Sequence, residues 1–460
     1  MYNCVENTDF RGKSCSVCGI GISNYPLIDF LLSRGASVVA RDRKSEAELS
    51  CAAALRGRGV ELRCGEDYLD DIEEDYIFRA PGIRYDVPGF VRAVERGSIL
   101  TSEMQLFFEL CPCRIIGITG SDGKTTTTTL ISKILEAAGY RVFVGGNIGR
   151  PLLPELGNMT ENDYAVVELS SFQLHTMTLS PDIAVVTNIS PNHLNYHKGM
   201  EEYVAAKENI FTHMRPGGRL VLNAENDYTR DMANRAAEGT DLLFFGKDGD
   251  ICERDGYITS GGKRILSCSD ILLPGHHNIE NYMAAVGALR GIVDADAVHT
   301  VAVTFTGVEH RCELVGERNG IKYYNSSIDS SPTRTLAALG NFAPCSIVLI
   351  CGGYDKHIPF EPLAAPICDR VRAAVMTGAT GEEIYKTVET EAERRRGLGE
   401  TVPELYLCPD FDEAVRKAAS VAHCGDVVLL SPACASFDAF PNFEVRGRRF
   451  KALVADIIGN

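Results

Sequence analysis

The sequence is poor in the features that mark membrane proteins and nucleic-acid-binding proteins. No apolar run in its 460 residues approaches the ~18–20 residues that cross a membrane, so we expect no membrane insertion. Basic residues are outnumbered, with 46 Lys and Arg against 62 Asp and Glu, and the net charge of −16 argues against broad binding to nucleic acid. The amino-terminal stretch has no basic region followed by an apolar core, so we expect no signal peptide and a cytoplasmic protein. A small anionic substrate can still bind to local basic residues.

The 16 cysteines do not form a recognisable metal site. Cys15 and Cys18 make one C-x-x-C, but no second such pair and no nearby histidine complete a zinc set. Cys111 and Cys113 flank a proline in a connecting segment. In a reducing compartment such residues are mostly small, buried, apolar side chains, and we expect that structural role for all four.

The length of the chain and the pattern of its apolar runs predict three α/β domains. One hydrophobic core is too small for this chain, because domains usually hold ~100–200 residues. Apolar, β-rich runs that end in polar residues alternate with helical segments, which is typical of mostly parallel sheets. We predict a Rossmann-like domain over residues 1–100, a central P-loop-type ATPase domain over 101–311 and a Rossmann-like carboxy-terminal domain over 312–460.

The first segment contains half of a nucleotide-binding βαβ unit. A strand enters the Gly-rich turn of "CSVCGIGIS", a helix closes at Gly35, and the next strand ends on Asp42. Another strand, in "IFRAPGI", stops at Pro81 and Gly82. A dinucleotide fingerprint requires a third glycine, where this chain has Asn24. The turn therefore suits a UDP-like nucleotide as well as a dinucleotide.

The stretch "GITGSDGKTTTTT" predicts a phosphate-binding loop. The strict P-loop pattern fails because Ile118 stands at its first glycine, but the shorter T-G-x-x-G-K-T form is complete. Gly120 and Gly123 let the backbone turn its N–H groups inward. Lys124 can reach the β and γ phosphates, and Thr125 can offer a hydroxyl to Mg²⁺. The helix that follows presents its amino terminus to the anion.

Three further polar residues follow apolar runs in the middle segment. Glu168 ends a strand, where a carboxylate that holds Mg²⁺ is often found. His193 and His197 lie in "NHLNYH" after another strand, and a histidine there is either a metal or phosphate ligand or a structural residue. Lys207 lies among small apolar residues in the helical run "YVAAKENIF" and by itself would pass for a lysine of an amphipathic face.

Six stretches, in order along the chain, resemble the Mur ligases, which are ATP-dependent enzymes that add amino acids to the peptidoglycan precursor. The stretches are TGSDGKT, GGNIGRPL, VVELSSFQL, NHLNYH, YVAAKENIF and GHHNIENYMAA, and the resemblance covers nearly the whole chain. Two others, "FTGVEHRCE" and "LLSPACASFDAFPNFEVRGRRF", resemble the members that join D-glutamate to UDP-N-acetylmuramoyl-L-alanine. The resemblance implies a ligase of peptidoglycan synthesis, and so a role in cell-wall biogenesis, cell shape and cell division.

The resemblance also implies roles for individual residues. ATP would be bound by Gly120, Ser121, Asp122, Gly123, Lys124, Thr125, Thr126, Asn278, Asn281 and Arg311, the last of which follows His310 in the motif that closes the central domain. The UDP-linked substrate would lie against Gly21, Ile22, Ser23, Asp42, Arg43, Pro81, Gly82 and Asn147. D-glutamate would be held by Ser330, Lys356, Ser436 and Phe443. The catalytic and metal-binding residues would be Lys124, Thr125, Glu168, His193 and Lys207, the last as a carbamate.

The implied reaction forms an amide through an acyl phosphate. ATP would phosphorylate the alanyl carboxylate, and the amine of D-glutamate would attack the product. Two anions meet in the first step. Lys124 and Mg²⁺ ions bound at two sites would offset the repulsion between them. We expect small-molecule substrates and a monomer. The alternatives are a related ligase with another acceptor, a NAD-dependent oxidoreductase that uses the first segment, and a degenerate nucleotide-binding homologue.

Two stretches depart from the family pattern. Where many members have a run like "NDSKATN", this chain has "NSSIDSSPT", with Ser326 at the acidic position, Ile328 at the lysine and Ser330 at the threonine. The missing lysine removes a cation, and Arg334 is the nearby residue that could replace its charge. In "NHLNYH", Asn195 stands where an aspartate is expected.

Overall fold

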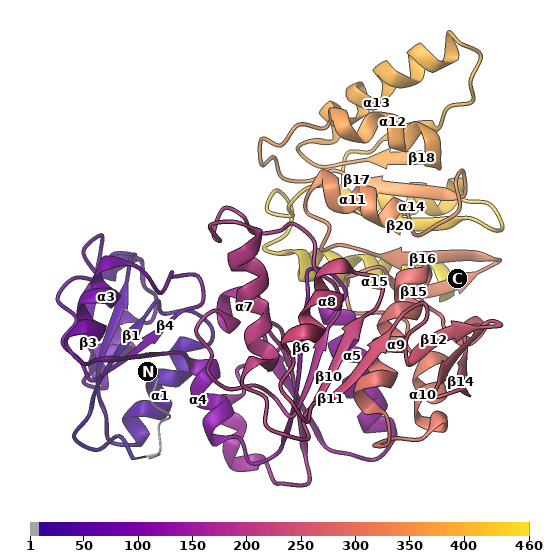
Figure 1. Ribbon diagram of the computed structural model, residues 1–460. Coiled ribbons are helices and arrows are strands. Elements are labelled where there is room, and N and C mark those ends of the chain that lie inside the picture. Colours follow the sequence, from indigo (N-terminus) through magenta and orange to yellow (C-terminus); the bar gives the residue numbers. More distant parts are fainter. Residues whose placement is uncertain (1–8, 460) are drawn as a thin grey trace. The chain divides into compact units, whose positions relative to one another are not determined.

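The computed structural model describes residues 9–459 and has the predicted α/β architecture (Figure 1). Residues 1–8, which begin the stretch considered for a signal peptide, and residue 460 lie outside the described part. The chain divides into two compact units. The first reaches Asp270 and includes His277–Val303, and the second comprises Ile271–His276 and the chain from Thr304 onward. The domain boundaries at residues 100 and 311 stay predictions.

The first sheet is parallel throughout, in the order β3-β2-β1-β4-β5. Its strands are β1 (Ser14–Cys18), β2 (Ser37–Asp42), β3 (Glu61–Cys64), β4 (Tyr76–Arg79) and β5 (Ile99–Thr101). Its helices are α1 (Asn24–Ser33), α2 (Ala52–Gly57), α3 (Pro88–Glu95) and α4 (Glu103–Leu110), with a 3₁₀ turn at Glu46–Glu48. The predicted strand, glycine turn, helix and strand are confirmed, and β2 ends at Asp42 as expected.

The central sheet of the first unit has the order β14-β13-β12-β11-β10-β9-β6-β8-β7. Its strands are β6 (Arg114–Thr119), β7 (Val142–Gly146), β8 (Tyr164–Glu168), β9 (Ile183–Val186), β10 (Arg219–Asn223), β11 (Asp241–Phe245), β12 (Ile251–Arg254), β13 (Tyr257–Ser260) and β14 (Lys263–Ser267). Its helices are α5 (Lys124–Ala137), α6 (Ser171–Leu174), α7 (Met200–Thr212), α8 (Asp227–Met232), α9 (His276–Leu289) and α10 (Ala295–Ala302), with 3₁₀ turns at Leu153–Asn158, Ala233–Arg235 and Cys268–Asp270.

One edge of the central sheet is an antiparallel ribbon that we did not predict. β12, β13 and β14 pair antiparallel, whereas the strands from β7 to β11 run parallel to β6. Asp255-Gly256 and Gly261-Gly262 make the two tight turns, with positive φ angles that such turns require. These dipeptides are hairpin signals that lie outside the apolar runs on which the prediction rested.

The second unit holds a sheet with the order β15-β16-β20-β17-β18-β19, parallel except for β15. Its strands are β15 (Glu313–Arg318), β16 (Ile321–Asn325), β17 (Ile347–Cys351), β18 (Val371–Met376), β19 (Glu404–Leu407) and β20 (Val427–Leu430). Its helices are α11 (Pro332–Leu339), α12 (Glu361–Arg370), α13 (Gly381–Arg396), α14 (Phe411–Val421) and α15 (Phe443–Gly459). Leu363 and Ile384 pack in one core and Val415 and Phe450 in another, so helices cover both faces.

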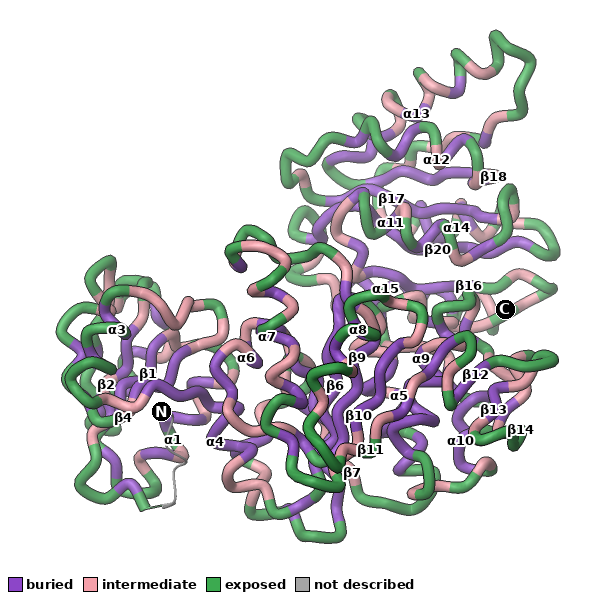
Figure 2. The backbone as a smooth tube through the Cα atoms, in the orientation of Figure 1, coloured by how far each residue is buried: buried purple, intermediate pink, exposed green. Residues whose placement is uncertain are grey.

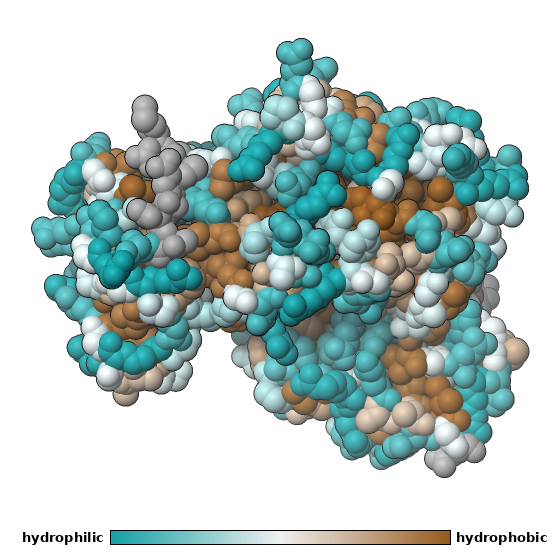
Figure 3. Space-filling model, turned by 90° about the horizontal axis from the view of Figure 1, so that it is seen from below, coloured by the Kyte–Doolittle hydropathy of each residue, from teal (hydrophilic) through white to brown (hydrophobic). Residues whose placement is uncertain are grey.

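In both units the inner strands are mostly buried, whereas the edge strands β3, β14 and β19 are partly exposed and many helix residues are exposed (Figure 2). The face drawn in Figure 3 carries many hydrophilic side chains with smaller apolar areas between them. No helix within residues 9–459 combines the length and the apolarity that a membrane crossing requires.

The cysteines of the two short motifs are free thiols. Cys15 and Cys18 are buried in β1, and burial raises the pKa of each thiol to about 12, so both stay protonated. The Sγ atoms of Cys111 and Cys113 lie 3.4 Å apart. The structure thus agrees with a structural role for the C-x-x-C pair.

Arg79 joins the first sheet to the central part of the same unit. It is the last residue of β4 and is only 1% exposed. Its guanidinium donates to the Phe172 carbonyl at 2.8 Å and the Thr176 hydroxyl at 3.0 Å, and to the Ile83 carbonyl at 2.8 Å in its own loop. Since these acceptors would lose their partner without the guanidinium, Arg79 stabilises the contact between β4 and the segment of α6.

We expect Arg79→Met to lower the free energy of unfolding by about 2–4 kcal/mol, because buried acceptors are left unsatisfied. Urea unfolding followed by circular dichroism measures this loss. Arg92→Met is the matched control, since Arg92 makes an exposed ion pair with Asp70. The control should cost less than about 0.5 kcal/mol. Identical unfolding curves for the two variants would contradict the role given to Arg79.

Candidate active site

The candidate site lies where three neighbouring strands of the central sheet end. β6 runs between β8 and β9, and all three are parallel, so their carboxyl ends meet at one edge. The predicted phosphate loop follows β6 and leads into α5, as the sequence indicated. Glu168 is the last residue of β8, and Thr187 and Asn188 follow β9. This edge is where α/β sheets usually place their ligands.

Two glycines give the loop its shape. Gly120 has a φ of +148°, and a Cβ there would collide with the Thr187 hydroxyl. Gly123 has a φ of +77°, and a Cβ there would come within 2.5 Å of the Asn281 side-chain oxygen. Both positions therefore require glycine, because their φ angles are positive and because a Cβ would overlap neighbouring atoms.

The loop amides do not all point inward as predicted. The Ser121 amide donates to the Asn188 carbonyl at 2.8 Å, and the Asp122 amide donates to the Asn188 side chain at 2.9 Å. The inward-facing donors are therefore the amides of the first turn of α5, which lack acceptors within the helix. The Lys124 ammonium folds over the loop and donates to the carbonyls of Gly120 and Ser121 at 3.0 and 2.9 Å.

Thr125 and Glu168 supply oxygen atoms beside the loop. The Thr125 hydroxyl donates to Glu168 Oε2 at 2.7 Å, and the Asn147 side-chain amide donates to Glu168 Oε1 at 2.8 Å. Hydroxyl and carboxylate oxygens are ligands that Mg²⁺ prefers, so this pair fits the predicted metal. Asn147 is predicted to contact the UDP-linked substrate; its side chain lies against this carboxylate, and the substrate contact stays a prediction.

Lys207 is a deeply buried basic residue beside the loop. It projects from α7, is 2% exposed, and its Nζ donates to the Gly120 carbonyl at 2.7 Å and lies 3.3 Å from the Thr119 hydroxyl. Burial, and then the charge of Lys124, hold the pKa of the Lys207 amine well below its ordinary value. A neutral amine is the form that can react with CO₂, so the setting suits the predicted carbamate.

His193 lies in the exposed loop between β9 and α7, with a φ of +54°. Partial burial, and the charges of Lys124 and Lys207, lower the pKa of its imidazole. The neutral imidazole is the form that binds metals. The ring packs against Phe172 with the centroids 4.9 Å apart. Asn195, the departure from the family pattern, is exposed in the same loop.

The predicted adenine-contacting residues lie beside the start of α5. Asn278 and Asn281 are both buried on α9. The Asn281 amide donates to the Asn278 side-chain oxygen at 3.2 Å, and its own oxygen accepts from Thr127 at 3.2 Å. Thr126, between the loop and this contact, is half-buried. Arg311 belongs to the second unit, and its role toward ATP stays a prediction.

Most residues predicted for the UDP-linked substrate lie at the carboxyl edge of the first sheet. These follow or end the adjacent strands β1, β2 and β4: Gly21, Ile22, Ser23, Asp42, Arg43, Pro81 and Gly82. The Asp42 carboxylate accepts from the Ile20 amide at 2.7 Å and so holds the glycine turn. Asn24, in place of the third fingerprint glycine, donates to the Gly19 carbonyl at 2.9 Å. Arg43 is exposed and pairs with Glu66 at 3.5 Å.

The residues predicted for D-glutamate all lie in the second unit. The Lys356 ammonium is exposed and lies 3.4 Å from the Ser330 carbonyl. Ser436 is buried, and the Phe443 carbonyl accepts from the Ser327 hydroxyl at 2.8 Å. A cavity of about 370 Å³ opens nearby, at the carboxyl ends of β17, β18 and β19, but none of the four predicted residues is among those that line it.

The departing stretch after β16 is built into the second unit. The Ser326 hydroxyl accepts from the Cys312 amide at 3.2 Å, and the Ile328 amide donates to the His310 carbonyl at 3.2 Å. Arg334 donates to the Ile328 carbonyl at 3.1 Å, so its guanidinium lies beside the position of the missing lysine. Buried His310 lies with its Nδ1 2.9 Å from the Asn325 amide.

Arg446 is a structural support that the sequence analysis missed. This buried guanidinium donates to the Ser327 hydroxyl at 3.1 Å and carbonyl at 2.9 Å, and to the Ala435 carbonyl at 3.0 Å. Burial lowers its pKa to about 10. It thereby ties together the two segments that carry Ser330 and Ser436. In sequence it is one of three arginines in "VRGRRF", and nothing separates it from the exposed Arg448 and Arg449.

We expect Gly120→Ala to weaken binding of an ATP analogue by at least about tenfold, because the loop must open to admit the methyl group. Equilibrium titration with a fluorescent ATP analogue measures this change. Gly157→Ala is the control, since nothing lies within 4 Å of a Cβ at that position. Equal affinities of both variants and the unmodified protein would contradict the proposed tight fit of the loop.

Comparisons with known proteins agree with this geometry. Residues 118–289 match the Mur ligase middle domain, and residues 310–434 match the Mur ligase, glutamate ligase domain. The UDP-N-acetylmuramoylalanine--D-glutamate ligase of Acetivibrio thermocellus is 49% identical over 97% of both chains, and that of Clostridium novyi is 48% identical over 98% of this chain and 99% of its own.

Solved structures share the fold. The UDP-N-acetylmuramate-alanine ligase of Thermotoga maritima superposes with a TM-score of 0.57 at 22% identity, covering 97% of this chain and all of that one. A UDP-N-acetylmuramoyl-L-alanyl-D-glutamate--2,6-diaminopimelate ligase gives 0.57 at 18% identity, covering 96% and 92%. With the phosphate loop, Glu168 and Lys207 at one sheet edge and this similarity along the full length, the chain belongs to the Mur ligase family.

Proposed function

We propose that this protein joins D-glutamate to UDP-N-acetylmuramoyl-L-alanine and converts ATP to ADP and phosphate. The observation that carries the ligase chemistry is the convergence of Lys124, Glu168 and Lys207 on one phosphate loop. The names of the relatives that match along the full length support the choice of substrates. The same proposal places the protein in the cytoplasm as a monomer and in the synthesis of the peptidoglycan precursor.

In the proposed reaction the alanyl carboxylate takes the terminal phosphoryl group of ATP, and the amine of D-glutamate then displaces phosphate. Lys124 and the first turn of α5 bind the phosphates, because an ammonium and a helix amino terminus both attract anions. Thr125 and Glu168 would hold Mg²⁺, which when bound draws negative charge away from the phosphates. His193 and a carbamate on Lys207 would hold a second ion.

The two substrates are proposed to approach from different elements. The turn after β1, with Asp42 and the Pro81-Gly82 segment beside it, would hold the UDP group. Lys356 and the buried Ser436 would bind the carboxylates of D-glutamate, and an ammonium is the expected partner for a dianionic amino acid.

The second candidate function is a related ligase with another acceptor, or a nucleotide-binding homologue without turnover. The observation in its favour is Ile328, which removes a cation that many family members have in this stretch. The guanidinium of Arg334 beside the Ile328 carbonyl supplies a replacement charge and favours the ligase.

We expect ADP release only when UDP-N-acetylmuramoyl-L-alanine and D-glutamate are both present with ATP and Mg²⁺. A coupled ADP assay with D-glutamate, L-glutamate, L-alanine and a diamino acid as acceptors measures this specificity. Equal turnover with another acceptor would refute the choice of D-glutamate, and binding of ATP and substrate without turnover would favour the non-catalytic homologue.

Lys207→Ala should lose nearly all activity, because no carbamate can form, and a short-chain carboxylate should restore part of it by supplying oxygen ligands. The ADP assay with and without added acetate or formate measures both effects. Lys133→Ala is the control, since Lys133 is exposed on α5. Unmodified turnover in Lys207→Ala would remove this residue from the mechanism.

A further inference from the structure

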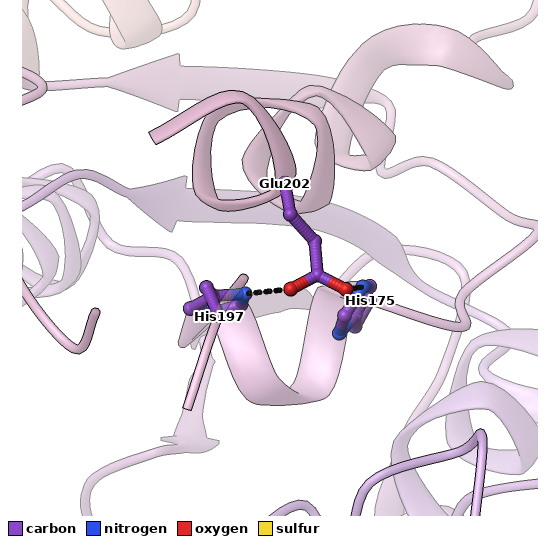
Figure 4. Close-up of side chains that lie close together, drawn as sticks. All are labelled: His175, His197 and Glu202. Carbon is purple, nitrogen blue, oxygen red and sulfur yellow. Dashed lines mark ion pairs between the residues drawn. The ribbon is translucent and has the colours of Figure 1, made fainter. Parts of the chain in front are cut away.

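Glu202 lies between two histidines in the first unit (Figure 4). It belongs to the first turn of α7, and its carboxylate oxygens lie 3.5 Å from His175 Nε2 and 3.8 Å from His197 Nδ1. His197 is fully packed, and its Nε2 lies 2.9 Å from the Ser171 hydroxyl. Two histidines and a carboxylate at these distances could in principle hold a metal ion.

The carboxylate is already bound by a guanidinium. Arg84 Nη2 donates to Glu202 Oε1 at 2.8 Å and Nη1 donates to Oε2 at 3.2 Å, and the Lys198 amide donates to Oε2 as well. Arg84 is the main reason why the pKa of Glu202 falls to about 2. A metal ion would have to displace the guanidinium from the carboxylate. We therefore assign Arg84, and not a metal, as the partner of Glu202.

Arg84 comes from the segment that we assign to the UDP-linked substrate. It lies two residues after Gly82, and the neighbouring Tyr196 hydroxyl donates to the Pro81 carbonyl at 3.2 Å. Asp86 of the same segment pairs with Arg84 at 2.8 Å and with Lys198 at 2.7 Å. Segment 81–86 is therefore tied to the loop before α7 and to the first turn of α7.

The helix that carries Glu202 also contacts the phosphate loop. Lys207 lies five residues after Glu202 on α7 and donates to the Gly120 carbonyl at 2.7 Å. His197 packs between the two regions, with its ring 5.3 Å from that of Tyr203, whose hydroxyl lies 2.9 Å from the Ser121 hydroxyl. A helix is rigid over this length, so a shift at Glu202 moves Lys207.

We propose that Arg84 and Glu202 form a positioning pair that couples occupation of the UDP-substrate segment to the placement of Lys207 against the phosphate loop. The side chains are each 19% exposed, so the paired charges are poorly screened, and the two-pronged geometry fixes direction as well as distance. The pair acts through Lys207 and does not itself touch the reacting atoms. The inference rests on the proposed function, because it concerns the same site.

The test is a double-mutant cycle on the turnover number with all substrates saturating. Arg84→Met and Glu202→Gln should each lower kcat by about tenfold or more, because small displacements of a catalytic group cost that much. The double variant should lose no more than the worse single variant, since both remove one interaction. Arg84→Lys and Glu202→Asp, which keep the charges, should recover part of the loss.

Two controls separate positioning from folding. Arg92→Gln and Asp70→Asn break an exposed ion pair between α3 and the loop before β4, and should leave kcat unchanged. The stoichiometry of UDP-N-acetylmuramoyl-L-alanine binding, measured by calorimetry, should stay near that of the unmodified protein in every variant, because it falls only when protein is lost to unfolding.

Unchanged kinetics in Arg84→Met and Glu202→Gln, additive losses in the double variant, or a rise in KM with kcat unchanged would each overturn the positioning pair. The binding stoichiometry could instead fall in proportion to the lost activity, in Arg84→Lys and Glu202→Asp as well. That result would show that the pair only stabilises the fold, and it too would overturn the proposal. If the unmodified protein turns over and the variants do not differ, only the pair fails. If the unmodified protein shows no acceptor-dependent ADP release, the proposed function fails and the pair with it.

Discussion

The contact between Lys207 Nζ and the Gly120 carbonyl is the interaction on which the candidate site depends. It joins the middle of α7 to the turn after β6, and it does so in a place from which water is largely excluded. Burial of this amine, and then the charge of Lys124 beside it, lower its pKa well below the ordinary value of a lysine. The same burial makes Lys207 unlike an exposed lysine, and it is the observation on which the proposed carbamate depends.

The strand order explains why the other groups meet around this contact. Since β6 lies between β8 and β9, the carboxylate of Glu168 arrives from one side of the loop and the Thr187 and Asn188 groups from the other. The chain as a whole carries a net charge of −16, yet two lysines converge on this loop. The proposed binding of an anion here thus depends on local geometry, since the overall charge opposes it.

Local chemistry made part of this structure predictable. The T-G-x-x-G-K-T stretch required a strand before it and a helix after it, and Glu168 and Asp42 were expected at strand ends because apolar runs stop there. Arg79, Arg84 and Arg446 escaped prediction, since a buried or half-buried arginine and an exposed one look alike in sequence. Their partners are mostly backbone carbonyls and a carboxylate far along the chain, which leave no pattern of spacing.

The sequence by itself determined which residues could bind phosphate and where the strands that carry them would end, because backbone conformation and apolar periodicity are local properties. It also determined the family, through motifs that occur in order. Only the tertiary structure decided that Asn147 meets Glu168, that Asn188 accepts from two of the loop amides, and that Glu202 binds Arg84. These outcomes depend on which elements lie side by side, and a hydrogen bond between residues over one hundred positions apart exists only after the chain has folded.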